Sequence, residues 1–171
     1  MKHALLALPL LLAACGDARL TDRIGLADPL RDVARQAPFE FGDTERLAGR
    51  PAEAARVAAE IEAFARATEI NPLWTHTRNA LLQPQLQIAR REFRQALGVP
   101  PSTPPEVAIR AFADASQALS QYNTPAAEAA LAPVGGAATL ARLSNLPRLP
   151  RVEEAAQALA IEVNERHRGN G

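Results

Sequence analysis

Residues 103–122 read TPPEVAIRAFADASQALSQY, and this stretch carries the strongest helix signature in the chain. Thr103 followed by Glu106 matches a capping box, with proline at the first helical position between them. Apolar side chains then recur every three or four residues, the period of a helix with one buried face. They are Ala108, Phe112, Ala115, Leu119 and Tyr122. The stretch therefore predicts an amphipathic helix that packs against other helices, and Asn123 is placed to cap a shorter helix that follows it.

The same period recurs on both sides of this helix. From Pro51 onward one face carries Ala54, Val57, Ala58, Ile61, Phe64 and Ala65, and in residues 150–168 one face carries Val152, Ala156, Leu159 and Val163. Residues 73–97 are framed by Asn71, which is placed as a cap, and by Gly98, but Pro84 interrupts them. Because an interior proline disrupts a straight helix, this segment predicts either a kink or two helices that meet near Gln83.

Composition and proline placement set the fold class. The chain has 171 residues, of which 47% are hydrophobic, only 4% are aromatic, and 14 are prolines. Few aromatic side chains and many helix-forming ones disfavour a sheet. We expect an all-α fold, an irregular bundle of about five or six helices with proline-rich connections. The helical domain is expected over residues 44–168, with a disordered tail at residues 169–171.

The first residues have the three-part pattern of a secretory signal. Lys2 supplies a positive charge, residues 4–12 are apolar, and small residues follow at Ala13 and Ala14. The uncharged run ends at Cys15 and is shorter than the about 20 residues that a membrane-spanning helix needs. Residues 1–14 are therefore predicted to be a signal peptide that is removed.

Leu12, Ala13, Ala14 and Cys15 resemble the bacterial lipobox, the motif that marks lipoprotein precursors. The resemblance implies cleavage before Cys15 and attachment of acyl chains, such as palmitate, through its thiol. Cys15 is also the only cysteine, so an intramolecular disulfide is excluded. Two alternatives remain open: a cytosolic protein with an apolar first helix, and an ordinary signal peptide cut near Ala14 that leaves a free thiol.

A lipidated Cys15 would place the protein in the bacterial cell envelope, held to a membrane by its acyl chains. Gly16, by resemblance to enterobacterial sorting, favours the periplasmic face of the outer membrane. Residues 15–43 are then expected to be a tether with helical pieces, in which Asp28 caps a restart at Pro29. Residues 38–43 are expected to be an extended connector or a short strand, with two phenylalanines that pin it to the bundle.

Charge and motifs exclude several classes of function. Nineteen basic side chains balance nineteen acidic ones, so no overall field favours nucleic acid as a partner. Phosphate-binding loops, nucleophile elbows, zinc-protease helices and cysteine clusters are all missing from the sequence. His76 and His167 are far apart and neither has a second histidine at helical spacing. We expect a protein that is not an enzyme and that needs no cofactor or metal.

The most site-like stretch is Trp74 to Asn79. It holds the only tryptophan, and Trp74, His76 and Arg78 are candidate binding residues because such side chains often anchor contacts. In the alternative, Trp74 packs as core near Pro84. The function expected is a protein-interaction or assembly module that docks on another envelope protein. The alternative function is a small-ligand-binding or enzymatic domain with a pocket near residues 74–79, which requires His76 close to Glu69, Glu92 or another carboxylate.

Charged side chains elsewhere are interpreted as solvated helix faces. Arg56 with Glu60, and Glu62 with Arg66, are spaced four apart as surface ion pairs are. The remaining charged group is Arg90, Arg91 and Arg94, which suits an acidic partner or a glycan phosphate, with a solvated face as the alternative.

Overall fold

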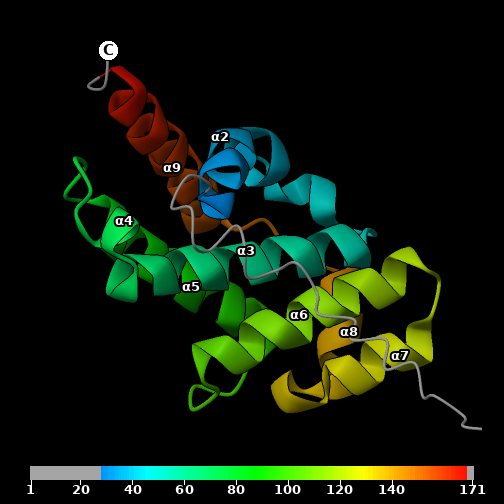
Figure 1. Ribbon diagram of the computed structural model, residues 1–171. Helices are drawn as coiled ribbons and strands as arrows, with labels where there is room; N and C mark the ends of the chain where they lie inside the picture. The colour runs from blue at the N-terminus through cyan, green and yellow to red at the C-terminus, as the bar shows by residue number, and fades with distance from the viewer. Residues whose placement is uncertain (1–27, 169–171) are drawn as a thin grey trace, which may run out of the picture.

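The computed structural model describes residues 28–168, and helices make up this range without a strand (Figure 1). The signal peptide, the lipobox and the tail at residues 169–171 lie outside the described residues. The elements are α2 (Pro29–Phe41), η2 (Thr44–Leu47), α3 (Pro51–Ile70), α4 (Pro72–Thr75), α5 (Leu82–Leu97), α6 (Pro105–Ser120), α7 (Thr124–Ala130), η3 (Ala132–Val134), α8 (Gly136–Ser144) and α9 (Pro150–Arg168). The all-α prediction is confirmed.

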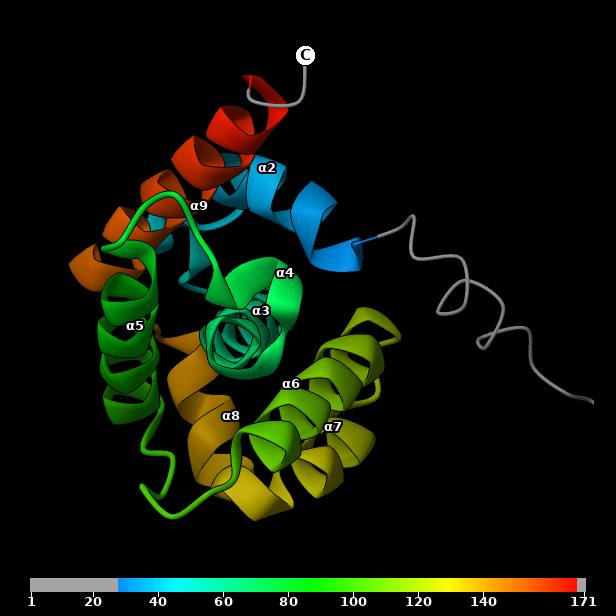
Figure 2. The same cartoon turned by 60° about the vertical axis from the view of Figure 1, so that its left-hand side comes forward.

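Helix α3 lies at the centre of the bundle, and Figure 2 views it nearly along its axis. It packs most extensively against α6 and also contacts α5, α4, α8 and α2. All six apolar residues predicted for its buried face are buried, as are Ala55, Ala59 and Ala67 on its other sides. Alanines bring neighbouring helices close, because the distance between helix axes depends on the side chains at the contact.

Three helices begin at the capping residues that the sequence predicts. The side-chain oxygens of Asp28, Asn71 and Asn123 each accept a hydrogen bond from a backbone N–H in the first turn. The capping box at Thr103 is wrong, because α6 has Pro104 at its N-cap and no side-chain capping bond. Thr103 lies one residue before the N-cap position of α6 and is buried. Its carbonyl oxygen accepts a hydrogen bond from Arg94 Nη1 at 3.0 Å.

Helix α2 lies within the segment expected to be a tether. It continues through Pro38, where an extended connector or a strand was predicted, and it packs against α9. An interior proline costs about 3 kcal/mol, but here the helix is held on both sides of Pro38 by burial of Ala37 before it and Phe41 after it. Of the two phenylalanines expected to pin this segment, only Phe41 is buried, whereas Phe39 is 72% exposed.

Eight α-helices are present in residues 28–168, more than the five or six predicted. The difference arises chiefly because residues 29–41 are helical and because residues 72–97 hold two helices, α4 and α5. Two helices are therefore present, as one alternative predicted, but the loop at residues 76–81 separates them and they do not meet near Gln83. Pro84 lies in the first turn of α5, where a missing N–H costs no hydrogen bond. In the same range, no helix combines the length and apolar composition needed to cross a bilayer.

A polar cluster ties η2 to the start of α9. The Thr44 backbone N–H and hydroxyl donate to Glu153 Oε1 at 3.0 and 2.9 Å, and the Thr44 hydroxyl accepts from the Leu149 N–H at 2.7 Å. Burial alone would raise the pKa of Glu153, but hydrogen bonds from Arg148 and Thr44 outweigh it and hold the pKa below its ordinary value. The carboxylate thus fastens two segments that are distant in sequence.

Candidate functional site

Trp74 belongs to the core. Its side chain is 1% exposed, and its ring meets Phe64 edge-on with centroids 5.5 Å apart. Its indole Nε1 donates to Asp28 Oδ2 at 2.9 Å, which joins α4 to the start of α2. Its ring therefore packs against Phe64, and the alternative in which Trp74 belongs to the core is the one the structure supports. Trp74 cannot present its ring to a partner in this arrangement.

His76 and Arg78 are exposed in the loop after α4. The Thr75 hydroxyl and His76 Nδ1 are 3.0 Å apart, and Arg78 Nη1 donates to the Glu165 carbonyl oxygen at 3.2 Å. The carboxylates required by the enzyme alternative are engaged elsewhere. Glu69 pairs with Arg66 and Arg90, while Glu92 accepts from the first N–H groups of α9. Among the side chains that the structure describes, no cluster is suited to a metal ion.

Two of the three arginines on α5 bind glutamates of α3 and so stabilise the packing of these two helices. Arg94 forms a two-pronged pair with Glu62, with nitrogen–oxygen distances of 2.5 and 2.8 Å, and Arg90 bonds Glu69 at 3.1 Å. Of the three, only Arg91 is exposed. The predicted surface pair of Glu62 with Arg66 is wrong: Glu62 is 3% exposed and faces α5, whereas Arg66 pairs with Glu69 and Glu106. The pair of Arg56 with Glu60 is confirmed.

Tyr122 has an unusual backbone conformation and an unusual environment. Its φ is 58°, the one positive value at a non-glycine residue in the described range, and its side chain is 96% exposed. Tyr122 N–H bonds the Leu119 carbonyl at 3.0 Å, and Asn123 N–H bonds the Ala118 carbonyl at 2.9 Å. These bonds form a Schellman motif, whose left-handed position is usually glycine because other residues are strained there.

The sequence placed Tyr122 on the buried stripe of α6, and this prediction is wrong. Ala108, Phe112 and Ala115 are buried and Leu119 is half-buried, so the stripe is correct up to its last turn. The left-handed turn then directs Tyr122 off the stripe. The helical period holds only while φ stays negative, and no glycine marks the end of this helix.

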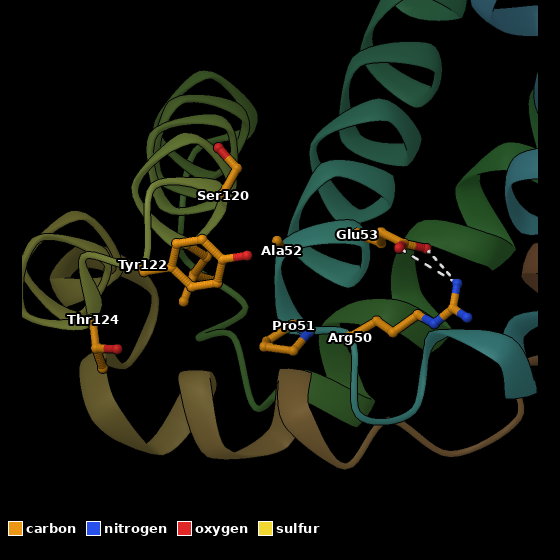
Figure 3. A pocket seen from close by; sticks show the side chains of 8 residues that line it. Arg50, Pro51, Ala52, Glu53, Ser120, Tyr122 and Thr124 are labelled. Atoms are coloured by element: carbon orange, nitrogen blue, oxygen red, sulfur yellow. Dashed lines mark hydrogen bonds and ion pairs between the residues drawn. The ribbon is translucent and has the colours of Figure 1, made fainter.

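Tyr122 stands at the rim of a groove between the end of α6 and the start of α3 (Figure 3). The groove has a volume of about 620 Å³ and is lined by Arg50, Pro51, Ala52, Glu53, Leu119, Ser120, Tyr122 and Thr124. The Tyr122 hydroxyl end points toward Ala52, and Arg50 Nη1 bonds both Glu53 carboxylate oxygens at 3.3 and 3.4 Å. The Ser116 hydroxyl donates to the Ala52 carbonyl at 2.9 Å and fixes α6 on α3.

No known protein family, curated protein or solved structure matches this chain. Pro51, Ala52 and Leu119 give the groove apolar walls, and three hydroxyl groups and one ion pair lie around them. Such a lining suits contact and hydrogen bonding, because shallow surfaces with an exposed aromatic residue are typical of protein contacts.

If the Tyr122 ring serves a partner and not the fold, then Tyr122→Gly raises the free energy of unfolding. We expect a gain of about 0.5–1 kcal/mol, because glycine adopts positive φ without the clash that Cβ causes. Chemical denaturation measures the change. The control is Tyr122→Ala, which removes the ring, retains the strained backbone and leaves stability nearly unchanged. Loss of stability in both variants would mean that the ring supports the fold.

Proposed function

We propose that this protein is a lipid-anchored envelope protein that docks another protein at the groove beside Tyr122 and acts by contact. The observation that carries the docking proposal is Tyr122, which is 96% exposed in a strained left-handed conformation. Backbone strain costs about 1–3 kcal/mol per residue and collects at functional sites. Aromatic side chains at interfaces also contribute a large share of binding energy.

The lipobox at residues 12–15 supports the anchor, and the position of the groove suits an anchored protein. Trp74 bonds Asp28, so the described chain starts beside the C-terminal end of α3. The groove lies at the opposite end of α3, which has 20 residues and a length of about 30 Å. The groove and the residue at which the described chain begins are therefore about the length of α3 apart, so an attachment that precedes Asp28 leaves the groove open to a partner.

The groove also indicates what kind of partner segment fits. Apolar walls formed by Pro51, Ala52 and Leu119 accommodate an aliphatic or aromatic side chain of the partner. The hydroxyls of Tyr122 and Thr124 line the same groove and supply donors and acceptors for the partner's backbone, and the Ser120 hydroxyl, which donates to the Gln117 carbonyl at 2.7 Å, can accept a further bond. We infer a protein segment with one apolar anchor residue flanked by polar groups.

Site-specific photocrosslinking in living cells tests this proposal. A photoreactive phenylalanine analogue replaces Tyr122, and the matched control places it at Phe39, the other strongly exposed aromatic residue of the described chain. We expect a discrete protein adduct from position 122 and none from position 39, because hot-spot residues lie at the partner contact. Equal labelling at both positions, or adducts to lipid alone, would rule out a protein-docking groove at Tyr122.

A further inference from the structure

Exposed apolar side chains gather at one end of the bundle. In the described range, three of the seven large apolar residues that are exposed fall within residues 70–81: Ile70 at 58%, Leu73 at 55% and Leu81 at 63%. This stretch has no acidic residue and carries His76 and Arg78, both exposed. We call Ile70, Leu73, His76, Arg78 and Leu81 the α4 face. Scattered exposed apolar residues are ordinary, but an apolar group with basic neighbours is typical of a membrane-contacting surface.

Ion pairs show why these residues share one end of the molecule. Arg90 pairs with Glu69 and Arg94 pairs with Glu62, so α5 runs antiparallel to α3. The start of α5, next to Leu81, therefore lies at the end of α3 that carries Ile70. The connecting loop is held to α9, because the buried Glu162 carboxylate accepts from the backbone N–H groups of Arg78 and Asn79. Figure 2 looks onto this end, with α4 in front of α3.

The described chain also begins at this end. The bond between Trp74 Nε1 and Asp28 places Asp28 beside α4. Cys15 lies only thirteen positions earlier, so even a fully extended chain separates its sulfur from Asp28 by at most about 45 Å. A bilayer that holds acyl chains on Cys15 is therefore within reach of the α4 face.

We propose that the α4 face lies against the lipid surface of the membrane that holds Cys15. Ile70 and Leu73 enter the headgroup region, where burial of apolar area favours contact, and Arg78 faces anionic lipid phosphate. This inference rests on the lipid anchor of the proposed function. It fixes the orientation of the domain, because contact at the α4 face directs the Tyr122 groove away from the bilayer.

A fluorescent probe on the acylated full chain tests this orientation. Leu73→Cys introduces a reactive thiol, since acylation consumes that of Cys15, and an environment-sensitive dye reports the polarity around it. The matched control is Phe39→Cys, also an exposed apolar site but at the far end of α2. In vesicles of phosphatidylethanolamine and phosphatidylglycerol, we expect a blue shift at position 73. We also expect quenching by lipids brominated near the headgroup to be several-fold stronger there than at position 39.

The possible outcomes distinguish a failure of the proposed orientation from a failure of the lipid anchor. Intact-mass measurement of the same preparation reports acylation directly, and an unmodified Cys15 overturns both the anchor and the orientation. Acylated protein whose dyes respond alike at positions 73 and 39 overturns the orientation alone. Protection of position 73 in native membranes but not in protein-free vesicles assigns the α4 face to a partner protein and also overturns it. Ile70→Cys is a second variant that is expected to repeat the result at position 73.

Discussion

Replacement of Glu62 by glutamine is expected to lower the free energy of unfolding by about 3 kcal/mol. The Glu62 side chain is 3% exposed and that of Arg94 is 15% exposed, so the substitution leaves a mostly buried guanidinium without its counter-charge. Arg94 also donates to the Thr103 carbonyl, which ties the loop before α6 to the same pair. Urea or guanidinium denaturation followed by circular dichroism measures the loss.

The matched control is Glu53→Gln, which lies on the same helix and also removes a carboxylate paired with an arginine. Side chains in that pair are 57% and 46% exposed, and the expected loss is below about 1 kcal/mol because water screens the interaction. A double variant, Glu62→Met with Arg94→Met, should recover most of the stability, since no buried charge remains. A loss at Glu62 no larger than at Glu53 would contradict this role for the pair.

Glu62 also shows that helical periodicity does not predict ion pairs between helices. Helical periodicity predicts one buried face for α3, and the residues on that face are indeed buried. Periodicity cannot show that α3 is the central helix, with neighbours on several sides. The spacing of four residues suggests Arg66 as the partner of Glu62, whereas the actual partner of Glu62 is Arg94, which belongs to α5. Pairings of this kind depend on how helices meet, and no pattern within one helix contains that information.

Local signals differ in how well they specify structure. The caps at Asp28, Asn71 and Asn123 are confirmed because each depends on one side chain and the nearest N–H groups. Residues 15–43 were predicted to be a tether with helical pieces and residues 38–43 a connector, because Pro38 suggests a break, whereas α2 continues through Pro38 and packs on α9. Of the binding candidates, Trp74 is buried, and the groove at Tyr122 was missed because the left-handed turn leaves no glycine in the sequence to mark it.

The largest change in location is expected from Cys15→Ser. If acyl chains on Cys15 hold the protein, variant molecules from which residues 1–14 have been removed move from the membrane fraction to the soluble fraction of the envelope. Each buried methylene contributes about 0.8 kcal/mol, so two or three chains anchor a protein stably while one chain holds it only weakly. The exposed apolar residues of the α4 face are too few to replace them. Fractionation with immunoblotting, combined with intact-mass analysis, measures the shift.

The control for this experiment is Ala14→Gly, which alters the same motif but retains a small residue before the cysteine. We expect it to remain acylated and membrane-bound, because the lipobox resemblance requires only small side chains at this position. Cys15→Ser protein whose intact mass shows that residues 1–14 have been removed, and that still resists release by high salt and alkaline carbonate, would show that the acyl chains are not the anchor. The groove at Tyr122 would then be presented by some other attachment, and the orientation argued from Asp28 would lose its basis.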